Sequence, residues 1–251
     1  MKGRSLILII SIFSFLGCDS EDAPGCIQTA GEIVSEEIEL ADFKEINVFD
    51  DVKLFIQQGS EHKVVVETGK NLLSGVTVEV LDGRLFIRNE KPCNYIRDYG
   101  ITKVTVTTPE LSWLQNSSHQ PIESIGVLSF PELWLRSLNQ ERDPEVYTNG
   151  DFILNLEVNS LRITNDNVSN YFLIGKVDKL NLFFAAGDGR LEAGELEAKQ
   201  IDLMHRGTNK LIVNPRESIR GDIFGFGDVI AKNRPPEVSV KEHYTGRLIF
   251  E

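Results

Sequence analysis

Four acidic residues in the last quarter of the chain have the types and spacing that acid–base chemistry would need: Glu195, Glu197, Asp202 and Asp222. Glycoside-cleaving enzymes use a pair of carboxylates, one as an acid and the other as a nucleophile or base. Asp202 and Asp222 are 20 residues apart, so in a fold with 20-residue coils they would lie about 5 Å apart on neighbouring strands. Arg206 and Lys210 supply positive charge nearby, but no arginine or lysine cluster of the kind that such enzymes use is evident. Solvated acidic edges are the favoured interpretation, and a β-helix carbohydrate-active enzyme is the alternative.

The histidines do not indicate a catalytic or metal centre. They are scattered, without partners two or four residues away: His62, His119, His205 and His243. Ser117 and Ser118 precede His119, but adjacent strand residues point to opposite faces and no nucleophile-elbow motif surrounds them. Asn165-Asp166-Asn167 and Gly187-Asp188-Gly189 resemble calcium-loop fragments without the full ligand set. The sequence predicts no catalytic residue, no metal and no cofactor.

Trp113 and Trp134 are 21 residues apart. If both project outward, they form an aromatic strip that can stack on sugar rings. Large aromatic side chains also fill protein cores, and that inward orientation is the favoured one. Both tryptophans are therefore speculative ligand-binding residues.

The N-terminal residues predict export and a lipid anchor. Two basic residues are followed by an apolar run from Leu6 to Leu16 and then by Gly17 and Cys18, which is the secretory pattern. The run is shorter than the roughly 20 residues that cross a bilayer. Residues 15–18 resemble the lipobox of bacterial lipoproteins, with Phe15 in place of the usual aliphatic residue. We expect residues 1–17 to be a lipoprotein signal peptide and Cys18 to carry the lipid, with a plain signal peptide as the alternative.

Residues 18–35 are expected to be an acidic linker. Their start, residues 19–22, resembles the acidic tag that displays Bacteroidetes lipoproteins on the cell surface. The expected location is therefore the outer membrane, lipid-anchored and surface-exposed, with a periplasmic face as the alternative. Without residues 1–17 the chain loses two of its 26 basic residues and none of its 38 acidic ones, so the mature net charge is −14. Such a charge disfavours nucleic acid as a partner.

With Cys18 lipidated, Cys26 and Cys93 remain as an even pair in an oxidising compartment. A disulfide between them is the natural hypothesis, and two free buried thiols are the alternative. No Cys-x-x-Cys pattern accompanies them, which disfavours a metal site.

The remaining sequence predicts strands and no helix. Six short runs rich in β-branched and aromatic residues fall at 45–48, 52–57, 63–67, 76–80, 84–88 and 103–107. Residues 58–60 and 81–83 read as tight hairpin turns between them. An antiparallel meander over residues 36–108 is the expectation.

From about residue 110 a repeat begins. Apolar residues two apart recur at 111/113, 133/135, 161/163, 180/182 and 201/203, and turn pairs at the later coils are 18 to 22 residues apart. A period near 20 with strand content alone is typical of a β-solenoid, in which coils stack apolar faces. We predict an all-β solenoid resembling a right-handed β-helix, and a β-sandwich is the alternative.

Several segments in order resemble one known family. They include Phe43-Lys44-Glu45-Ile46, Asp82-Gly83-Arg84-Leu85-Phe86-Ile87, Cys93-Asn94-Tyr95 and Gly225-Phe226-Gly227-Asp228 followed by Pro235-Pro236. Over residues 36–251 the chain is similar to the putative auto-transporter adhesin, head GIN domain family. The resemblance implies stacked β-strands on the surface of a Bacteroidetes-type cell, and brings no catalytic residues.

The leading hypothesis is a noncatalytic, surface-exposed envelope lipoprotein that binds a glycan or a protein. The alternatives are the carbohydrate-active enzyme and a structural envelope component. An exposed aromatic strip would favour the first hypothesis, and a flat apolar patch the last.

Overall fold

The structure, a computed structural model, describes residues 25–90, 95–96, 98–139 and 141–251. The predicted signal peptide, Cys18 and Cys93 lie outside these residues. Apart from two three-residue 3₁₀ turns, the regular structure of the described chain is strand. The predicted all-β class is confirmed.

The elements in chain order are η1 (Gly25–Ile27), β1 (Ile33–Ile38), β2 (Glu45–Asp50), β3 (Lys53–Gln58), β4 (Lys63–Gly69), η2 (Leu73–Gly75), β5 (Val76–Leu81), β6 (Arg84–Asn89), β7 (Lys103–Thr108), β8 (Trp113–Ser118), β9 (Ile122–Leu128), β10 (Glu132–Ser137), β11 (Phe152–Asn165), β12 (Tyr171–Phe184), β13 (Leu191–His205), β14 (Leu211–Ile223), β15 (Val229–Ala231), β16 (Glu237–Glu242) and β17 (Leu248–Phe250).

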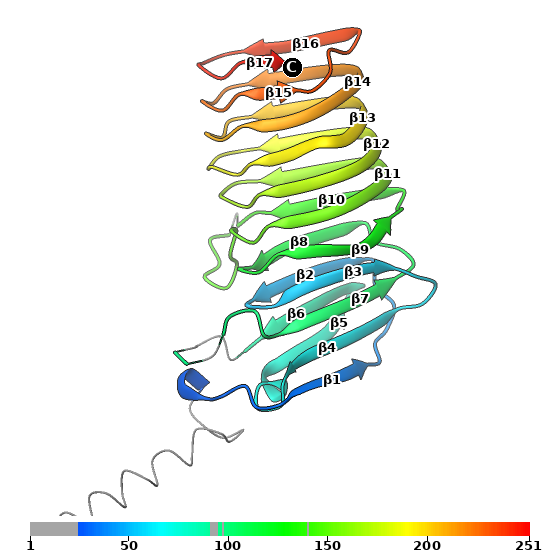
Figure 1. The fold of residues 1–251 in the computed structure, drawn as a ribbon, viewed down its shortest axis with the longest axis vertical. Helices are drawn as coiled ribbons and strands as arrows, with labels where there is room; N and C mark the ends of the chain where they lie inside the picture. Colours follow the sequence, from blue (N-terminus) through cyan, green and yellow to red (C-terminus); the bar gives the residue numbers. More distant parts are fainter. Residues whose placement is uncertain (1–24, 91–94, 97, 140) are drawn as a thin grey trace, which may run out of the picture.

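The strands stack as coils along one axis and form a solenoid with two faces (Figure 1). Face 1 contains β1, β4, β7, β3, β9, the first parts of β11 to β14, β15 and β17 in that order. Face 2 contains β5, β6, β2, β8, β10, the second parts of β11 to β14, and β16. The long strands β11 to β14 belong to both faces, because each pairs with different neighbours along its two halves.

The core lies between the faces and is built from the predicted apolar repeat. On face 2, Leu161 pairs with Leu180, which pairs with Ile201 on the next coil. All three side chains are buried in one continuous hydrophobic cluster. Such coil-to-coil stacking of equivalent apolar residues is parallel, unlike the antiparallel sheets of a β-sandwich. The structure therefore bears out the solenoid.

One coil is out of chain order. Strands β2 and β3 lie between the β6–β7 coil and the β8–β9 coil, pairing parallel with both. Residues 36–108 are thus continuous with the solenoid. Antiparallel pairing is limited to β1–β4, β4–β7 and β5–β6, so the meander covers fewer strands than expected.

The two predicted hairpin turns differ in outcome. Asp82 and Gly83 have φ values of 51° and 78° and join the antiparallel strands β5 and β6, as an Asp-Gly turn should. The turn at 58–60 does not make a hairpin, because β7 lies between β3 and β4 in the sheet. That prediction was wrong because a turn motif specifies a reversal of the chain and not the strand that fills the neighbouring position.

Two further features bear on the predicted disulfide and on membrane attachment. The backbone N–H of Tyr95 donates to the carbonyl of Cys26 at 2.9 Å, so the chain just after Cys93 lies beside Cys26. Among the described residues, no helix has the length and apolar character to span a membrane.

Candidate functional site

The most unusual cluster of side chains lies on the outer surface of face 2. We call it the Arg–Trp ladder, and its members are Arg84, Trp113, Arg136, Trp134 and Arg162. It crosses the strands β6, β8, β10 and β11, together with the intervening β2. The ladder brings together residues from positions 84 to 162 because parallel stacking aligns equivalent positions of successive coils.

Strand alternation places these side chains outside. In β10, Leu133 and Leu135 are buried in the core, so Trp134 and Arg136 point away from it. Trp134 pairs in register with Trp113 of β8. Trp113 is only 6% exposed, yet it does not belong to the core cluster. Other residues on the outer surface therefore cover it.

Arginine side chains supply much of that cover. The Arg84 guanidinium lies 4.0 Å from the Trp113 ring centre, and the Arg162 guanidinium lies 4.1 Å from the Trp134 ring centre. Arg136 lies 5.2 Å from the Trp113 ring centre and 4.8 Å from that of Trp134. These distances are within the range of cation–π attraction. The Nε1 of Trp134 donates to the Thr164 hydroxyl at 2.9 Å, which fixes the ring.

The three guanidinium groups differ in how their charge is balanced. Arg84 pairs with Glu45, and its Nε donates to the carboxylate at 2.8 Å. In the part of the chain that the structure describes, neither Arg136 nor Arg162 forms an ion pair. The Nε of Arg136 is buried without a hydrogen-bond partner there. Burial lowers the pKa of Arg136 below its ordinary value, and the charges of Arg84 and Arg162 lower it further.

Residues 138–139 and 141–151 cover part of face 2. The Nε2 of Gln115 donates to the Leu138 carbonyl at 3.5 Å, and the backbone N–H of Tyr147 donates to the Ser117 carbonyl at 3.3 Å. A cavity of about 250 Å³ remains between the covering segment and the ladder. Its lining includes Arg84, Trp113, Arg136, Asn47, Gln115, Glu141 and Asp143. The cavity combines guanidinium groups, an aromatic ring and side-chain amides.

The sequence indicated the tryptophans but not the arginines. Both rings are on the outer surface, contrary to the favoured inward orientation, although arginine covers Trp113. An available signal was the alternation of arginine with buried residues, as in Leu133-Trp134-Leu135-Arg136 and Leu161-Arg162-Ile163. That signal identifies an outward side chain without identifying its neighbours on other coils.

The structure does not bring the candidate carboxylates together. Asp202 is in register with Arg220, and Asp222 is in register with Met204, because β13 and β14 are offset by 18 residues at this point and not by 20. Arg220 forms an ion pair with Asp202, and hydrogen bonding from that guanidinium lowers the pKa of Asp202. Asp222 contacts His243 at 2.7 Å. The prediction that Asp202 and Asp222 stack on neighbouring strands is therefore wrong.

The two other acids also do not form a pair suited to catalysis. Glu197 forms an ion pair with Arg216 on the next coil. Glu195 is exposed and pairs in register with Ile174. Both lie on face 1, whereas Asp202 lies on face 2. Within the described residues, no group of three or more His, Cys, Asp or Glu residues is placed to hold a metal ion.

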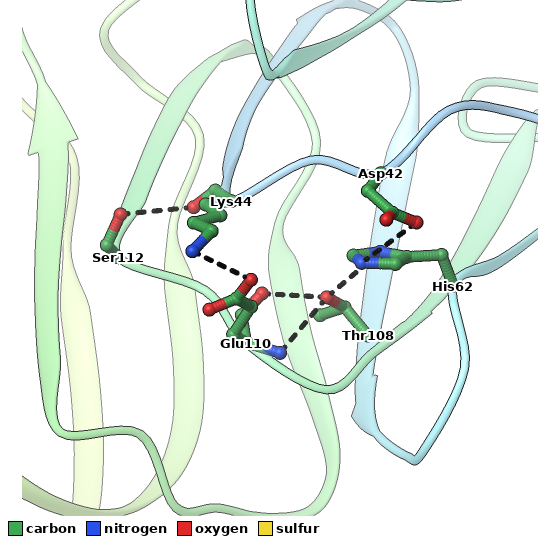
Figure 2. A network of polar contacts seen from close by, with 6 residues as sticks. All are labelled: Asp42, Lys44, His62, Thr108, Glu110 and Ser112. Carbon is green, nitrogen blue, oxygen red and sulfur yellow. Dashed lines mark hydrogen bonds and ion pairs between the residues drawn. The ribbon is translucent and has the colours of Figure 1, made fainter.

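In a polar network near the start of β2, a histidine contacts an acid on one side and a hydroxyl on the other (Figure 2). His62 lies 3.7 Å from the carboxylate of Asp42 and 3.4 Å from the Thr108 hydroxyl. This order superficially matches a hydrolase triad. However, Thr108 is fully buried and its hydroxyl donates to the Glu110 carbonyl at 2.7 Å. A substrate therefore has no access to this hydroxyl.

The same network has a clear structural role. Lys44 forms an ion pair with Glu110 at 3.0 Å, and the Ser112 hydroxyl donates to the Lys44 carbonyl at 3.2 Å (Figure 2). These contacts join the segment before β2 to the segment that links β7 and β8. They stabilise the position of the coil that is out of chain order.

Face 1 carries an apolar groove of about 830 Å³ over β11, β12, β13 and β14. Its wall includes Ile153, Phe172 and Ile174, each more than two-fifths exposed. Glu195 and Lys232 also line it. Register shifts after Ile153 and after Phe172 interrupt the regular pairing here, and such bulges redirect side chains at a sheet surface.

A third surface lies on the turn edge of the last coils. The rings of Phe224 and His243 stack 4.3 Å apart, and those of Phe226 and Tyr244 meet edge-on at 4.9 Å. Phe226 is 61% exposed. This edge includes the Gly225-Phe226-Gly227-Asp228 segment.

Comparison with known proteins agrees with the stacked-strand fold. The family model described as "Putative auto-transporter adhesin, head GIN domain" matches residues 42–235. The chain belongs to the head GIN domain family. The family is described by adhesion and not by an enzymatic activity, in agreement with a binding role.

Solved structures of similar fold come from Bacteroides and Parabacteroides species. A putative adhesin of Bacteroides fragilis has a TM-score of 0.76 at 18% identity, covering 89% of this chain and 99% of that one. A putative adhesin of Parabacteroides distasonis has a TM-score of 0.63 at 16% identity, and the match covers 89% of this chain and 99% of that one. A protein of the same species, called a putative lipid binding protein, has a TM-score of 0.59 at 17% identity. The match covers 87% of this chain and 97% of that one. No curated protein matches the chain. At these identities the neighbours establish the fold of this head GIN domain.

Proposed function

We propose that this head GIN domain is a noncatalytic binding module of the cell envelope, held on the outer membrane by lipid at Cys18 and displayed on the cell surface. Its ligand is a glycan that lies across face 2 at the Arg–Trp ladder. The observation that carries the proposal is the in-register Trp113–Trp134 pair, which three arginines interleave on the outer surface. A periplasmic location of the same module is the alternative.

The chemistry of the ladder suits a sugar chain. Each guanidinium carries five N–H donors in a fixed plane, which match sugar hydroxyl and carboxylate oxygens. The partly exposed ring of Trp134 offers an apolar surface to the C–H face of a sugar. Ligand contacts along the stack repeat at about 4.8 Å, the spacing between strands. A linear oligosaccharide can therefore contact several coils at once.

A glycan-array screen tests this function. The probe is the mature chain with Cys18→Ser, which prevents lipidation, and the matched variant adds Trp134→Ala. We expect glycan binding by the first protein and a loss of about tenfold or more in the second, as truncation of a central aromatic contact typically gives. Phe226→Ala, which removes an exposed ring from the turn edge, is the control and should bind normally. Absence of any glycan hit would contradict the proposal.

A second candidate ligand is a lipid acyl chain in the groove of face 1. The specific observation is the apolar wall formed by Ile153, Phe172 and Ile174 with Lys232 nearby, and one structural neighbour is called a putative lipid binding protein. Titration with dodecanoate tests it. Phe172→Asp should abolish binding if the groove is the site, while Trp134→Ala should leave it unchanged.

A further inference from the structure

We propose that the Arg–Trp ladder recognises an anionic oxygen group on its ligand, so that the glycan is an acidic one, and that Arg136 is the residue in direct contact with the anion. This inference rests on the proposed glycan-binding function and specifies its ligand class. It assigns a role to a charged group that has no acid at ion-pair distance in the described part of the chain, where Asp166 and Glu45 act on it only from further away.

The first argument is the imbalance of charge around Arg136. The chain carries a formal net charge of −12, and six of the eleven arginines in the described residues have an acid at ion-pair distance, as Arg84 has Glu45. Across the described residues, Arg136 has no such acid, and its buried Nε donates to nothing. Arg136 is half-buried, and a buried N–H donor that makes no hydrogen bond is costly for a fold. Binding of an anion would supply the missing acceptor.

The second argument is the position of the neighbouring cations. Arg84 and Arg162 lie on either side of Arg136, with Trp113 and Trp134 between the three guanidinium groups. The tryptophan rings hold the three positive charges in a row by cation–π contact. Like charges held close together repel, and the attraction of each guanidinium to a bound carboxylate or sulfate offsets that repulsion.

The third argument is the cavity beside Arg136. Its volume of about 250 Å³ is below the range of pockets that enclose a drug-sized ligand, so it suits one terminal group of a longer molecule. A guanidinium binds a carboxylate or sulfate through two parallel N–H donors, and the Trp113 ring and the Gln115 amide are close by. Glu141 and Asp143 also line the cavity. Direct contact with Arg136, and not a long-range field, must therefore supply the attraction.

Matched oligosaccharides test the anion requirement. Calorimetry would compare tetragalacturonate with its fully methyl-esterified neutral form, using the mature Cys18→Ser chain. We expect the acid to bind at least about tenfold more tightly, the gain typical of a charge-assisted contact. Arg136→Gln should reduce binding of the acid to the level of the neutral form, and Arg136→Lys should retain part of it. Arg216→Gln, which removes an arginine from face 1, is the control and should change nothing.

A sulfated tetrasaccharide is the second anionic probe, because sulfate offers the same oxygen geometry. Dependence of its binding on Arg136 supports the proposal as galacturonate does. Equal affinity for acidic and neutral sugars, with sensitivity to Trp134→Ala but not to Arg136→Gln, overturns the anion site and leaves glycan binding intact.

A readout that needs no glycan separates the anion-site proposal from the glycan-binding proposal further. Inorganic sulfate, at an ionic strength matched with chloride, should raise the melting temperature of the wild type more than that of Arg136→Gln. That difference without any glycan binding supports the anion site and refutes the glycan function. If sulfate raises both melting temperatures equally, and binding of acidic sugars does not depend on Arg136, the anion site is refuted.

Discussion

Trp113 and Trp134 are direct partners on the neighbouring parallel strands β8 and β10, and the Arg136 guanidinium lies 5.2 Å and 4.8 Å from their ring centres. This relationship changes what the tryptophans can do. Trp113 does not form a bare platform for sugars, because it is only 6% exposed, whereas Trp134 stays partly exposed. Both rings also hold a row of guanidinium groups at the surface.

The ladder predicts that Arg136 contributes to binding without contributing to the stability of the fold. Arg136→Met removes a buried cation that has no partner and keeps apolar contact with both rings. We expect the free energy of unfolding to stay within about 0.5 kcal/mol of the wild type, or to rise, while binding of an acidic sugar is lost. Urea denaturation checks it. Arg84→Met, which removes the partner of Glu45, is the comparison, and a loss above about 1 kcal/mol in Arg136→Met would show that the cation stabilises the fold.

The buried His205 predicts a dependence of stability on pH. Its Nε2 is 3.0 Å from the Asn209 carbonyl, and burial lowers its pKa below the ordinary value. The unfolded chain, with a pKa near 6.5, therefore binds the proton more readily than the folded chain. Stability should be complete above about pH 6.5 and fall as the pH decreases below it, by at most about 1.4 kcal/mol per unit.

Thermal denaturation between pH 5 and pH 8 measures this effect. His205→Phe should remove this part of the pH dependence, since phenylalanine does not titrate and the ring already packs edge-on against Phe184. His119→Gln, which replaces an exposed histidine, should keep it. An identical pH profile in wild type and His205→Phe would contradict the assignment.

Gly221 predicts a severe effect of a small substitution. Its φ is 131°, and an added Cβ would lie 1.9 Å from the Leu203 carbonyl oxygen of the preceding coil. Gly221→Ala should therefore lower the free energy of unfolding by at least about 3 kcal/mol. Gly83 also has a positive φ but nothing near its Cβ position, so Gly83→Ala should cost only about 1 kcal/mol. Equal losses would mean that backbone strain alone, and not the contact between coils, sets the cost.

The expected Cys26–Cys93 disulfide remains a prediction, and the Tyr95–Cys26 backbone hydrogen bond supports it. Closing a loop of this length stabilises a fold by about 4 kcal/mol in the chain-entropy model. Peptide mapping without reduction should recover the linked peptides, and Cys26→Ser should lower the melting temperature. Alkylation of both cysteines in the unreduced native protein would contradict it.

Lipidation of Cys18 also remains a prediction. In cells given an alkyne analogue of palmitate, the wild type should become labelled and partition into detergent, while Cys18→Ser should do neither. Cys26→Ser should still be labelled. Protease treatment of intact cells then tests surface display, since a periplasmic protein would resist digestion.

The sequence by itself determined the class and the repeat of this protein. Apolar residues two apart, recurring with turns about every 20 residues, specify which side chains face the core, because the period of a strand is two. Leu161, Leu180 and Ile201 are buried as that pattern requires. The Asp82-Gly83 turn likewise follows from local backbone preferences.

Only the tertiary structure decided which strands are neighbours. The same pattern of inward residues is compatible with many stacking orders, and no local preference places β2 between β6 and β8. The 18-residue offset that pairs Asp202 with Arg220 also arises from a local register shift that the turn spacing does not reveal. The Arg–Trp ladder depends on both decisions, because its arginines and tryptophans meet only where separate coils are stacked in one register.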